Sequence, residues 1–307
     1  LALYQAKESG RGRFEFFNAG LSDVVRNRLA LSQDLRKTVS EGKGLFVQYQ
    51  PQVQLDTGHV TGFEALLRWK HPERGLVSPS EFIPIAESSH LICDVGLWVL
   101  REAVHQAKAW IDAGEPPRQM AVNVSAAQIW RSDFAADVAA LLEETGLEPS
   151  LLCLELTESL LADHTEGQVR QVLERLSGLG VTLALDDFGT GYSSLGYLKQ
   201  LPFNKLKIDR IFISGATQSV HARELLSGII ALTRGLNMTA VAEGAELPEE
   251  VDMLREMGCD NVQGFAYARP QSADEAIAFV HRHERALLAT IPVPRRSRKT
   301  QSRSSAA

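Results

Sequence analysis

Cysteine is scarce in this sequence and follows no metal-binding pattern. The three cysteines, Cys93, Cys153 and Cys259, are widely separated, and no two of them form a Cys-x-x-Cys pair. An odd number of scattered cysteines predicts neither a disulfide framework nor a zinc site. This usage favours a reducing compartment, and we therefore expect a cytoplasmic location.

Long apolar runs and an excess of basic residues are also lacking. No uninterrupted apolar run is long enough to span a bilayer, and the N-terminus lacks the charged and apolar regions of a signal peptide. We expect any membrane anchor to lie upstream of Leu1 in a longer parent protein. The 32 Lys and Arg residues against 38 Asp and Glu residues give a net charge of -6, which gives no reason to expect binding to nucleic acid polymers.

Two common site signatures are absent as well. Residues 188–192, Phe-Gly-Thr-Gly-Tyr, lack the Gly-Lys-Ser/Thr ending of a P-loop, so on their own they predict a glycine turn rather than a phosphate cradle. His71 and His90 have no second histidine at ligand spacing, and we assign neither to a metal. The composition, 44% hydrophobic and 23% charged, is otherwise that of a soluble globular protein.

A repeated unit of short apolar strand, loop and amphipathic helix fills the chain from residue 45 to about residue 282. About eight such units over roughly 240 residues match the size of a (β/α)8 barrel. The first two strands are separated only by residues 51–59, too few for a helical crossover, so we expect this pair to be antiparallel. We therefore predict an α/β fold, a TIM-like (β/α)8 barrel with one antiparallel strand. Strands are expected at 46–50, 60–68, 121–125, 151–156, 181–186, 205–209, 239–242 and 261–264.

Polar residues recur near the ends of these strands, where barrels of this kind carry their chemistry. Asn123, Glu155 and Lys207 each lie between two apolar neighbours, so strand alternation directs their side chains to the barrel lumen. Several carboxylates in one desolvated cavity need positive charge, and oxygen ligands suit Mg²⁺ or Mn²⁺ better than zinc. The polar residues expected at this end are Glu64, Asn123, Glu155, Asp186, Asp187, Lys207, Asp209, Glu243, Glu246 and Gln263.

Each of these residues also has an ordinary structural interpretation. A single acidic residue near a strand end is usually a solvated loop carboxylate or a helix N-cap. Lys207 could be a structural partner of Asp209, and both roles are compatible. The placement of all these residues at one end of the predicted barrel favours a site.

A series of short motifs follows one order along the chain. They are Glu64-Ala65-Leu66, then Asn-Val-Ser at 123–125, Glu-Leu-Thr-Glu-Ser at 155–159, Asp-Asp-Phe-Gly-Thr-Gly-Tyr-Ser-Ser-Leu at 186–195, Leu-Lys-Ile-Asp at 206–209, Ala-Glu-Gly-Ala-Glu at 242–246 and Gln-Gly at 263–264. Over residues 45 to 282 the sequence thereby resembles the EAL-domain family of cyclic di-GMP phosphodiesterases. Each string alone is weak evidence, whereas the whole series at barrel spacing is strong.

The resemblance implies roles for individual residues. It assigns one metal ion to Glu64, Asn123, Glu155 and Asp186, and a second to Asp186, Asp187 and Glu243. Lys207 positions the attacking water or the phosphate, Asp209 holds Lys207 in place, and Glu246 and Gln263 support the water and the metal shell. Glu243 acts as a general base or as a ligand, and the ligand role is favoured. Substrate contacts are implied for Gln50, Leu66, Arg68, Asp209 and Gln263.

The loop after the sixth predicted strand also has an implied role. Glu158 matches the residue that anchors the loop 188–194, which in the family shapes the second metal site and lies near a dimer contact. A homodimer is therefore expected. Two departures from the usual family pattern, Ala245 in place of valine and Phe265 in place of tyrosine, touch no metal position.

The implied function is hydrolysis of cyclic di-GMP to linear pGpG by two Mg²⁺ or Mn²⁺ ions per site, with Ca²⁺ as an inhibitor. The alternative is a catalytically weak EAL domain that acts as a cyclic di-GMP receptor or as a dimerising regulatory module. Every ligand position that can be matched holds the expected residue type, which favours catalysis.

The two ends of the chain differ from its middle. Residues 1–20 resemble the C-terminal end of a GGDEF diguanylate cyclase domain, through Ala-Leu-Tyr-Gln-Ala-Lys at 2–7 and Gly-Arg-Gly-Arg at 10–13. We therefore expect GGDEF and sensor domains upstream in the parent protein. Residues 21–44 predict a linker helix, residues 45–285 the barrel, and residues 286–307 a disordered tail rich in basic residues and serine.

Overall fold

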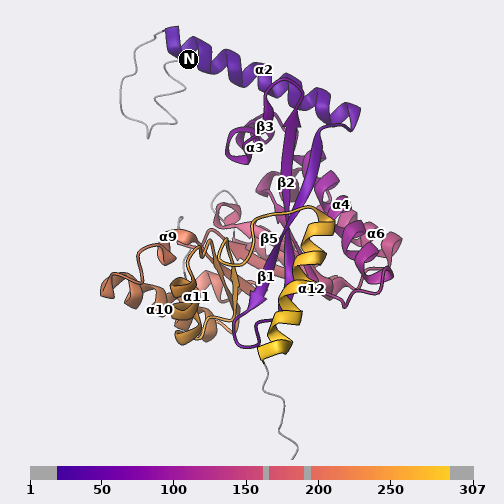
Figure 1. Cartoon of the computed structure of the whole chain (residues 1–307). Coiled ribbons are helices and arrows are strands. Elements are labelled where there is room, and N and C mark those ends of the chain that lie inside the picture. Colours follow the sequence, from indigo (N-terminus) through magenta and orange to yellow (C-terminus); the bar gives the residue numbers. More distant parts are fainter. Residues whose placement is uncertain (1–18, 162–165, 190–194, 291–307) are drawn as a thin grey trace, which may run out of the picture.

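The strands of this protein form one closed sheet. The computed structural model describes residues 19–161, 166–189 and 195–290. Its nine-stranded sheet has the order β1-β9-β8-β7-β6-β5-β4-β2-β3, and an additional pairing of β1 with β2 closes all strands except β3 into a barrel (Figure 1). The strands are β1 (Leu45–Gln54), β2 (Val60–His71), β3 (Gly75–Val77), β4 (Gln119–Val124), β5 (Leu152–Thr157), β6 (Thr182–Asp186), β7 (Lys205–Ile208), β8 (Thr239–Glu243) and β9 (Asn261–Gln263).

One strand of the barrel runs against the others. β1 pairs antiparallel with both β2 and β9, whereas the remaining neighbours in the barrel, from β2–β4 to β8–β9, are parallel. The turn between β1 and β2 is too short for a helical crossover, which forces the reversal. The predicted fold, a TIM-like α/β barrel with one antiparallel strand, is confirmed.

Helices cover the outside of the sheet. Outward leucines such as Leu154, Leu183 and Leu206, all fully buried, pack against this helical layer. None of the described helices is both long and apolar enough to cross a membrane. The helices are α2 (Ala19–Glu41), α3 (Pro79–Ser88), α4 (Ile92–Asp112), α5 (Ala126–Arg131), α6 (Phe134–Thr145), α7 (Glu166–Gly178), α8 (Leu195–Leu198), α9 (Arg210–Ile213), α10 (Val220–Gly235), α11 (Pro248–Glu256) and α12 (Ala273–Thr290), with 3-10 turns η1 (Pro149–Leu151) and η2 (Glu158–Leu161).

The register of the strands brings the polar positions level with one another. Gln50 on β1 lies opposite Glu64 on β2, Asn123 opposite Glu155, and Glu243 opposite Gln263. Two residues earlier on β4, β5 and β6, the small side chains Ala121, Cys153 and Ala184 form a buried cluster of their own. Since alternate residues share one face of a strand, this small apolar layer lies in the lumen beneath the polar layer.

Several boundaries differ from the sequence-based expectations. β1 continues through Pro51 to Gln54. Proline is tolerated there because β9 pairs with β1 only at Val53 and Gln54, so the missing N–H of Pro51 removes no hydrogen bond to β9. The short strand β3 was not predicted. Helix α12 continues to Thr290, so residues 286–290 are helical rather than part of a tail. The rest of the predicted tail and the GGDEF-like residues 1–18 lie outside the described residues.

Helix α2 begins two residues before the predicted linker and otherwise lies within it. The helix packs on a lobe at one end of the barrel, made by the outer part of β2 with β3 and α3 (Figure 1). Leu31 and Leu35 of α2 join Trp69 and Phe82 in a second buried core. The Trp69 indole N–H donates to the hydroxyl of Thr38 at 3.2 Å. The helix is therefore attached to the barrel domain by both apolar packing and a buried hydrogen bond.

Replacing Leu35 with alanine tests this attachment. Leu35 is fully buried, so Leu35→Ala should lower the free energy of unfolding by about 2–5 kcal/mol through lost apolar burial and a residual cavity. The matched control is Leu29→Ala on the same helix, where the leucine is 62% exposed and the change should stay within about 0.5 kcal/mol. Urea unfolding measures both. Equal effects of the two substitutions would contradict the docking of α2.

Candidate functional site

A buried lysine occupies the centre of the polar layer. Lys207 follows the alternation of β7 into the lumen, where only 2% of its side chain is exposed. Its ammonium Nζ lies 2.5 Å from Oε2 of Glu155, 2.9 Å from Oδ2 of Asp186 and 2.7 Å from Oε1 of Glu243. Oε1 of Glu64 is 3.7 Å away. Four carboxylates from four strands thus surround one cation.

Amide side chains hold Glu64 on the other side of the cluster. Asn123 Nδ2 donates to Oε1 of Glu64 at 2.6 Å, and Gln263 Nε2 donates to Oε2. Gln263 Nε2 also lies 3.1 Å from Oε1 of Gln50, and Gln50 Nε2 donates to the carbonyl of Ala268 at 3.0 Å. Both oxygens of Glu64 are therefore oriented by side chains from two other strands, β4 and β9.

The charges of this cluster are unbalanced. Burial, followed by the charge of Glu64, raises the pKa of Glu155 well above its usual value. Burial also raises the pKa of Glu243 to about 8, with Lys207 opposing the shift. Burial alone would lower the pKa of Lys207, but the carboxylates, Glu155 first, raise it above its usual value. The lysine therefore stays protonated, while the carboxylates compete for too little positive charge.

The donor set fits a hard divalent cation. All the side-chain donors are carboxylate or amide oxygens, which suit Mg²⁺ or Mn²⁺. Oε1 of Glu243 is buried and forms an ion pair with the ammonium of Lys207 at 2.7 Å. Within the described part of the chain, no group of three or more His, Cys, Asp or Glu side chains is arranged to hold a metal ion, because the carboxylates turn toward Lys207. Four of the predicted metal ligands, Glu64, Glu155, Asp186 and Glu243, thus lie around one lysine.

The end of β6 places two adjacent aspartates differently. Asp186 is buried at the lysine, whereas Asp187 is exposed and has a positive φ of 55°. The N–H of Asp187 donates to Oδ1 of Asp186 at 2.8 Å, and burial together with Asp186 raises the pKa of Asp187. Glu158 accepts from the N–H of Gly189 at 3.2 Å, at the start of the loop that it was predicted to anchor. Residues 190–194 of that loop lie outside the described residues.

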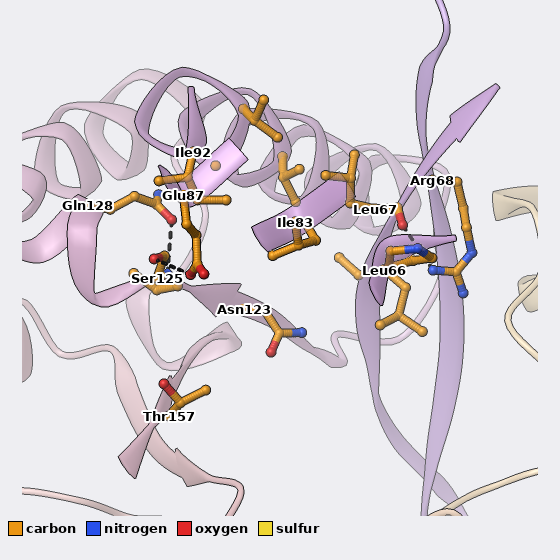
Figure 2. Close-up of a pocket in the computed structure, with 16 residues that line it drawn as sticks. Leu66, Leu67, Arg68, Ile83, Glu87, Ile92, Asn123, Ser125, Gln128 and Thr157 are labelled. Carbon is orange, nitrogen blue, oxygen red and sulfur yellow. Dashed lines mark hydrogen bonds between the residues drawn. The ribbon is translucent and has the colours of Figure 1, made fainter. Parts of the chain in front are cut away.

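Two cavities open beside the cluster and share Leu66. One, of about 300 Å³, is shown in Figure 2: it lies between β2, β4, α3 and α4, and its lining includes Arg68, Ile83, Asn123 and Thr157. The other, of about 260 Å³, is lined by Gln50, Leu66, Glu64, Arg210, Glu243, Gly244, Glu246, Gln263, Gly264 and Phe265. The carboxylate cluster therefore has a recess on each side of Leu66.

The guanidinium of Arg68 lines the first cavity and is held in place. Its Nε donates to Oε1 of Gln48 at 2.8 Å, and its NH1 donates to the carbonyl of Leu67 at 2.9 Å. Burial lowers the pKa of Arg68, and Glu64 opposes the shift. Since an arginine keeps its charge in proteins, this cavity contains a fixed positive group beside the carboxylates.

Two predicted site residues have other contacts. Asp209 does not hold Lys207: its carboxylate caps α9 by accepting from the N–H of Ile211 at 2.8 Å. A free N–H at the start of a helix is a nearby partner for such a side chain, which explains the difference. Glu246 forms an ion pair with Arg210 at the rim of the second cavity.

Some residues of the site were not predicted. Gln52 is 3% exposed, and its Nε2 donates to Oε1 of Gln263 at 3.0 Å. The alternation of glutamine at 48, 50 and 52 was the available signal, because every second residue of a strand shares a face. Gly264 was known only as a motif residue. It follows β9 directly, and a Cβ there would lie 2.0 Å from the carbonyl oxygen of Ala245 in the loop after β8, so only glycine fits at this position.

Comparisons with known proteins identify relatives. Residues 32–270 match the family described as the EAL domain. The chain is 42% identical over 279 residues to the bifunctional diguanylate cyclase/cyclic di-GMP phosphodiesterase MucR of Pseudomonas aeruginosa, covering 91% of this chain and 40% of that protein. It is 40% identical over 270 residues to the cyclic di-GMP phosphodiesterase NbdA of the same organism, covering 88% and 34%. The chain thus spans less than half the length of these curated relatives.

A solved structure agrees with these matches. The phosphodiesterase of PaMucR in complex with c-di-GMP superposes with a TM-score of 0.76 at 43% identity, covering 80% of this chain and 99% of that one. A second similar structure is the EAL domain of DcpA from Mycobacterium smegmatis, with a TM-score of 0.66 at 31% identity, covering 79% and 98%. The similarity therefore extends over almost all of each solved domain.

Substitutions of two buried glutamates, Glu155 in the cluster and Glu250 in α11, test whether the cluster carries unbalanced charge. In the metal-free protein, Glu155→Gln removes a charge that burial and Glu64 disfavour, so the free energy of unfolding should stay the same or rise. Glu250, 8% exposed, accepts from the N–H groups of Glu246 and Leu247 at the start of α11. Glu250→Gln should therefore lower the free energy of unfolding by about 1 kcal/mol. Urea unfolding in EDTA compares the two; a larger loss for Glu155→Gln would contradict the charge imbalance.

Proposed function

This chain belongs to the EAL domain family, and from that premise we propose that it hydrolyses cyclic di-GMP to the linear dinucleotide pGpG. The observation that carries the proposal is the cluster of four carboxylates around one buried ammonium, flanked by two recesses. A purely structural ion cluster would balance its charges, because unpaired buried charge is costly. Relatives with at least 40% identity are named cyclic di-GMP phosphodiesterases.

The family implies a dependence on divalent cations. We propose that two Mg²⁺ or Mn²⁺ ions serve this site and that Ca²⁺ permits binding but inhibits hydrolysis. When bound, such ions activate a water molecule and neutralise the charge that develops on the phosphate. The proposed ligands are Glu64, Asn123, Glu155 and Asp186 for one ion and Asp186, Asp187 and Glu243 for the other.

The protein's own groups divide the remaining work. Lys207, whose pKa is raised, stays protonated and acts as a cationic hydrogen-bond donor to the phosphate or the water rather than as a base. Burial raises the pKa of Glu243 to about 8 although Lys207 opposes the shift, and a metal ion bound nearby would lower it. Glu243 then serves as a ligand rather than as a proton acceptor, in agreement with the role favoured from the sequence.

The substrate is a dianion with two purine halves. We propose that the two cavities on either side of Leu66 each receive one half, and that Arg68, fixed by Gln48 and the carbonyl of Leu67, faces a phosphate. An arginine held by hydrogen bonds is pre-organised for a phosphate and loses little rotamer freedom on binding. Gln50 and Gln263 line the second cavity and are assigned to the base within it.

The setting in a longer protein is also a proposal. The relatives extend well beyond the matched region, and the name of MucR combines a diguanylate cyclase with a phosphodiesterase. Together with the GGDEF-like residues at the N-terminus, this supports a parent protein with a cyclase-like domain upstream of α2. A homodimer is proposed from the family resemblance of the loop that Glu158 anchors, and a cytoplasmic location from the scattered cysteines.

Hydrolysis of cyclic di-GMP tests the proposal. Purified protein with Mg²⁺ or Mn²⁺ should convert cyclic di-GMP to pGpG, and chromatography measures the product. Glu64→Ala and Asp186→Asn should each abolish turnover, because each removes a carboxylate from the cluster. The matched control Asp274→Asn, an exposed aspartate in the first turn of α12, should keep full activity.

Calorimetry with Ca²⁺ supplies the second arm of this test. Cyclic di-GMP should bind in Ca²⁺ without forming pGpG. If the protein binds cyclic di-GMP but does not hydrolyse it in Mg²⁺ or Mn²⁺, it is a receptor and not an enzyme. Full activity of Asp186→Asn would contradict the proposed metal ligands.

A further inference from the structure

A row of glutamines on β1 reaches from the barrel wall to the carboxylate cluster. Gln48, Gln50 and Gln52 alternate along the strand and so share one face. Gln48 supports Arg68, and Gln50 contacts Gln263. Gln52 is 3% exposed, and its side-chain amide donates to Gln263 rather than to one of the carboxylates.

The hydrogen bonds along this row have one possible direction. Glu64 can only accept, so the end of the Gln263 side chain that faces it must be the Nε2 amide. The other end of Gln263 is then the oxygen Oε1, which needs a donor because Gln263 is 4% exposed. The donor is Nε2 of Gln52, at 3.0 Å. The carbonyl of Ala268, which also only accepts, fixes Gln50 in the same way.

A glutamine amide has no strong preference between its two orientations. The torsion at its terminal sp² carbon is broad and roughly two-fold, so neighbouring donors and acceptors decide which end points where. If Gln263 turned over, its oxygen would face Oε2 of Glu64 and Oε1 of Gln50, three acceptors together in a buried space. The donor at Gln52 makes that orientation unfavourable.

We propose that Gln52 is a positioning residue for the metal site: by donating to Oε1 of Gln263 it fixes the Gln263 amide, which in turn orients the carboxylate of Glu64 for cation binding. This inference rests on the proposed function, in which Glu64 is a metal ligand. Two hydrogen bonds, through Gln263, link Gln52 to the carboxylate of Glu64, so Gln52 acts on the metal site only indirectly. Partners of this kind typically change metal affinity by 10–100-fold.

Binding of Mn²⁺ measured by calorimetry tests the proposal without relying on turnover. Gln52→Leu removes the donor and should weaken Mn²⁺ binding by about tenfold. Gln52→Glu, which keeps the size of the side chain, presents an acceptor to Gln263, draws Nε2 away from Glu64 and should weaken binding further. The matched control is Gln54→Leu on the same strand, whose amide oxygen pairs with Thr57 away from the cluster, and which should bind Mn²⁺ as the unmodified protein does.

A double-mutant cycle separates positioning from a general structural effect. Because Gln52 acts through Gln263, Gln52→Leu should cause no further loss, within about twofold, once Gln263→Leu is present. Circular dichroism and urea unfolding establish which variants are folded, and either Gln52 variant alone suffices for the comparison.

Three results would overturn the inference. Unchanged Mn²⁺ binding by a folded Gln52 variant, or losses that multiply in the double variant, would show that Gln52 does not act through Gln263 while leaving the proposed function intact. Absence of Mn²⁺ binding by the unmodified protein would remove the proposed function and this inference together.

Discussion

The proposed activity depends on a local excess of negative charge in the barrel lumen. Glu64, Glu155, Asp186 and Glu243 converge on the single ammonium of Lys207, each from a different strand. No flexible loop brings them together: the register of the parallel strands sets their height, and the small layer of Ala121, Cys153 and Ala184 beneath them leaves room for their side chains. A chain selected for stability alone would replace such a cluster with apolar residues, which are often more stable in a barrel interior.

Neutral amides carry out the fine positioning around this charge. Asn123 and Gln263 each hold one oxygen of Glu64, and Gln50 and Gln52 hold Gln263. Amides can orient a carboxylate without cancelling its charge, so the cluster keeps its demand for cations.

At the edge of the site, α3 separates α2 from the first cavity: Ile85 packs in the core that contains Leu35, whereas Ile83 lines the cavity (Figure 2). The long helix that precedes the barrel is therefore one helix away from the proposed substrate.

Much of the fold followed from the sequence because its signals are local. The short interval between β1 and β2 required an antiparallel pair, and the apolar neighbours of Asn123, Glu155 and Lys207 placed these side chains in the lumen. Contacts at the ends of elements could not be predicted in the same way. Asp209 had two available partners, and only the geometry of the chain shows that the N–H of Ile211 is nearer than Lys207. Gln52 was visible as an alternating glutamine, but its role depends on the pairing of β1 with β9, whose Gln263 is 211 residues away along the chain.

Anomalous diffraction from crystals grown with Mn²⁺ tests the central claim most directly. The account predicts anomalous density among Glu64, Glu155, Asp186 and Glu243, since cations supply the charge that Lys207 alone does not. Well-ordered carboxylates that still turn to Lys207, with no anomalous density at this end of the barrel when Mn²⁺ is saturating, would contradict it.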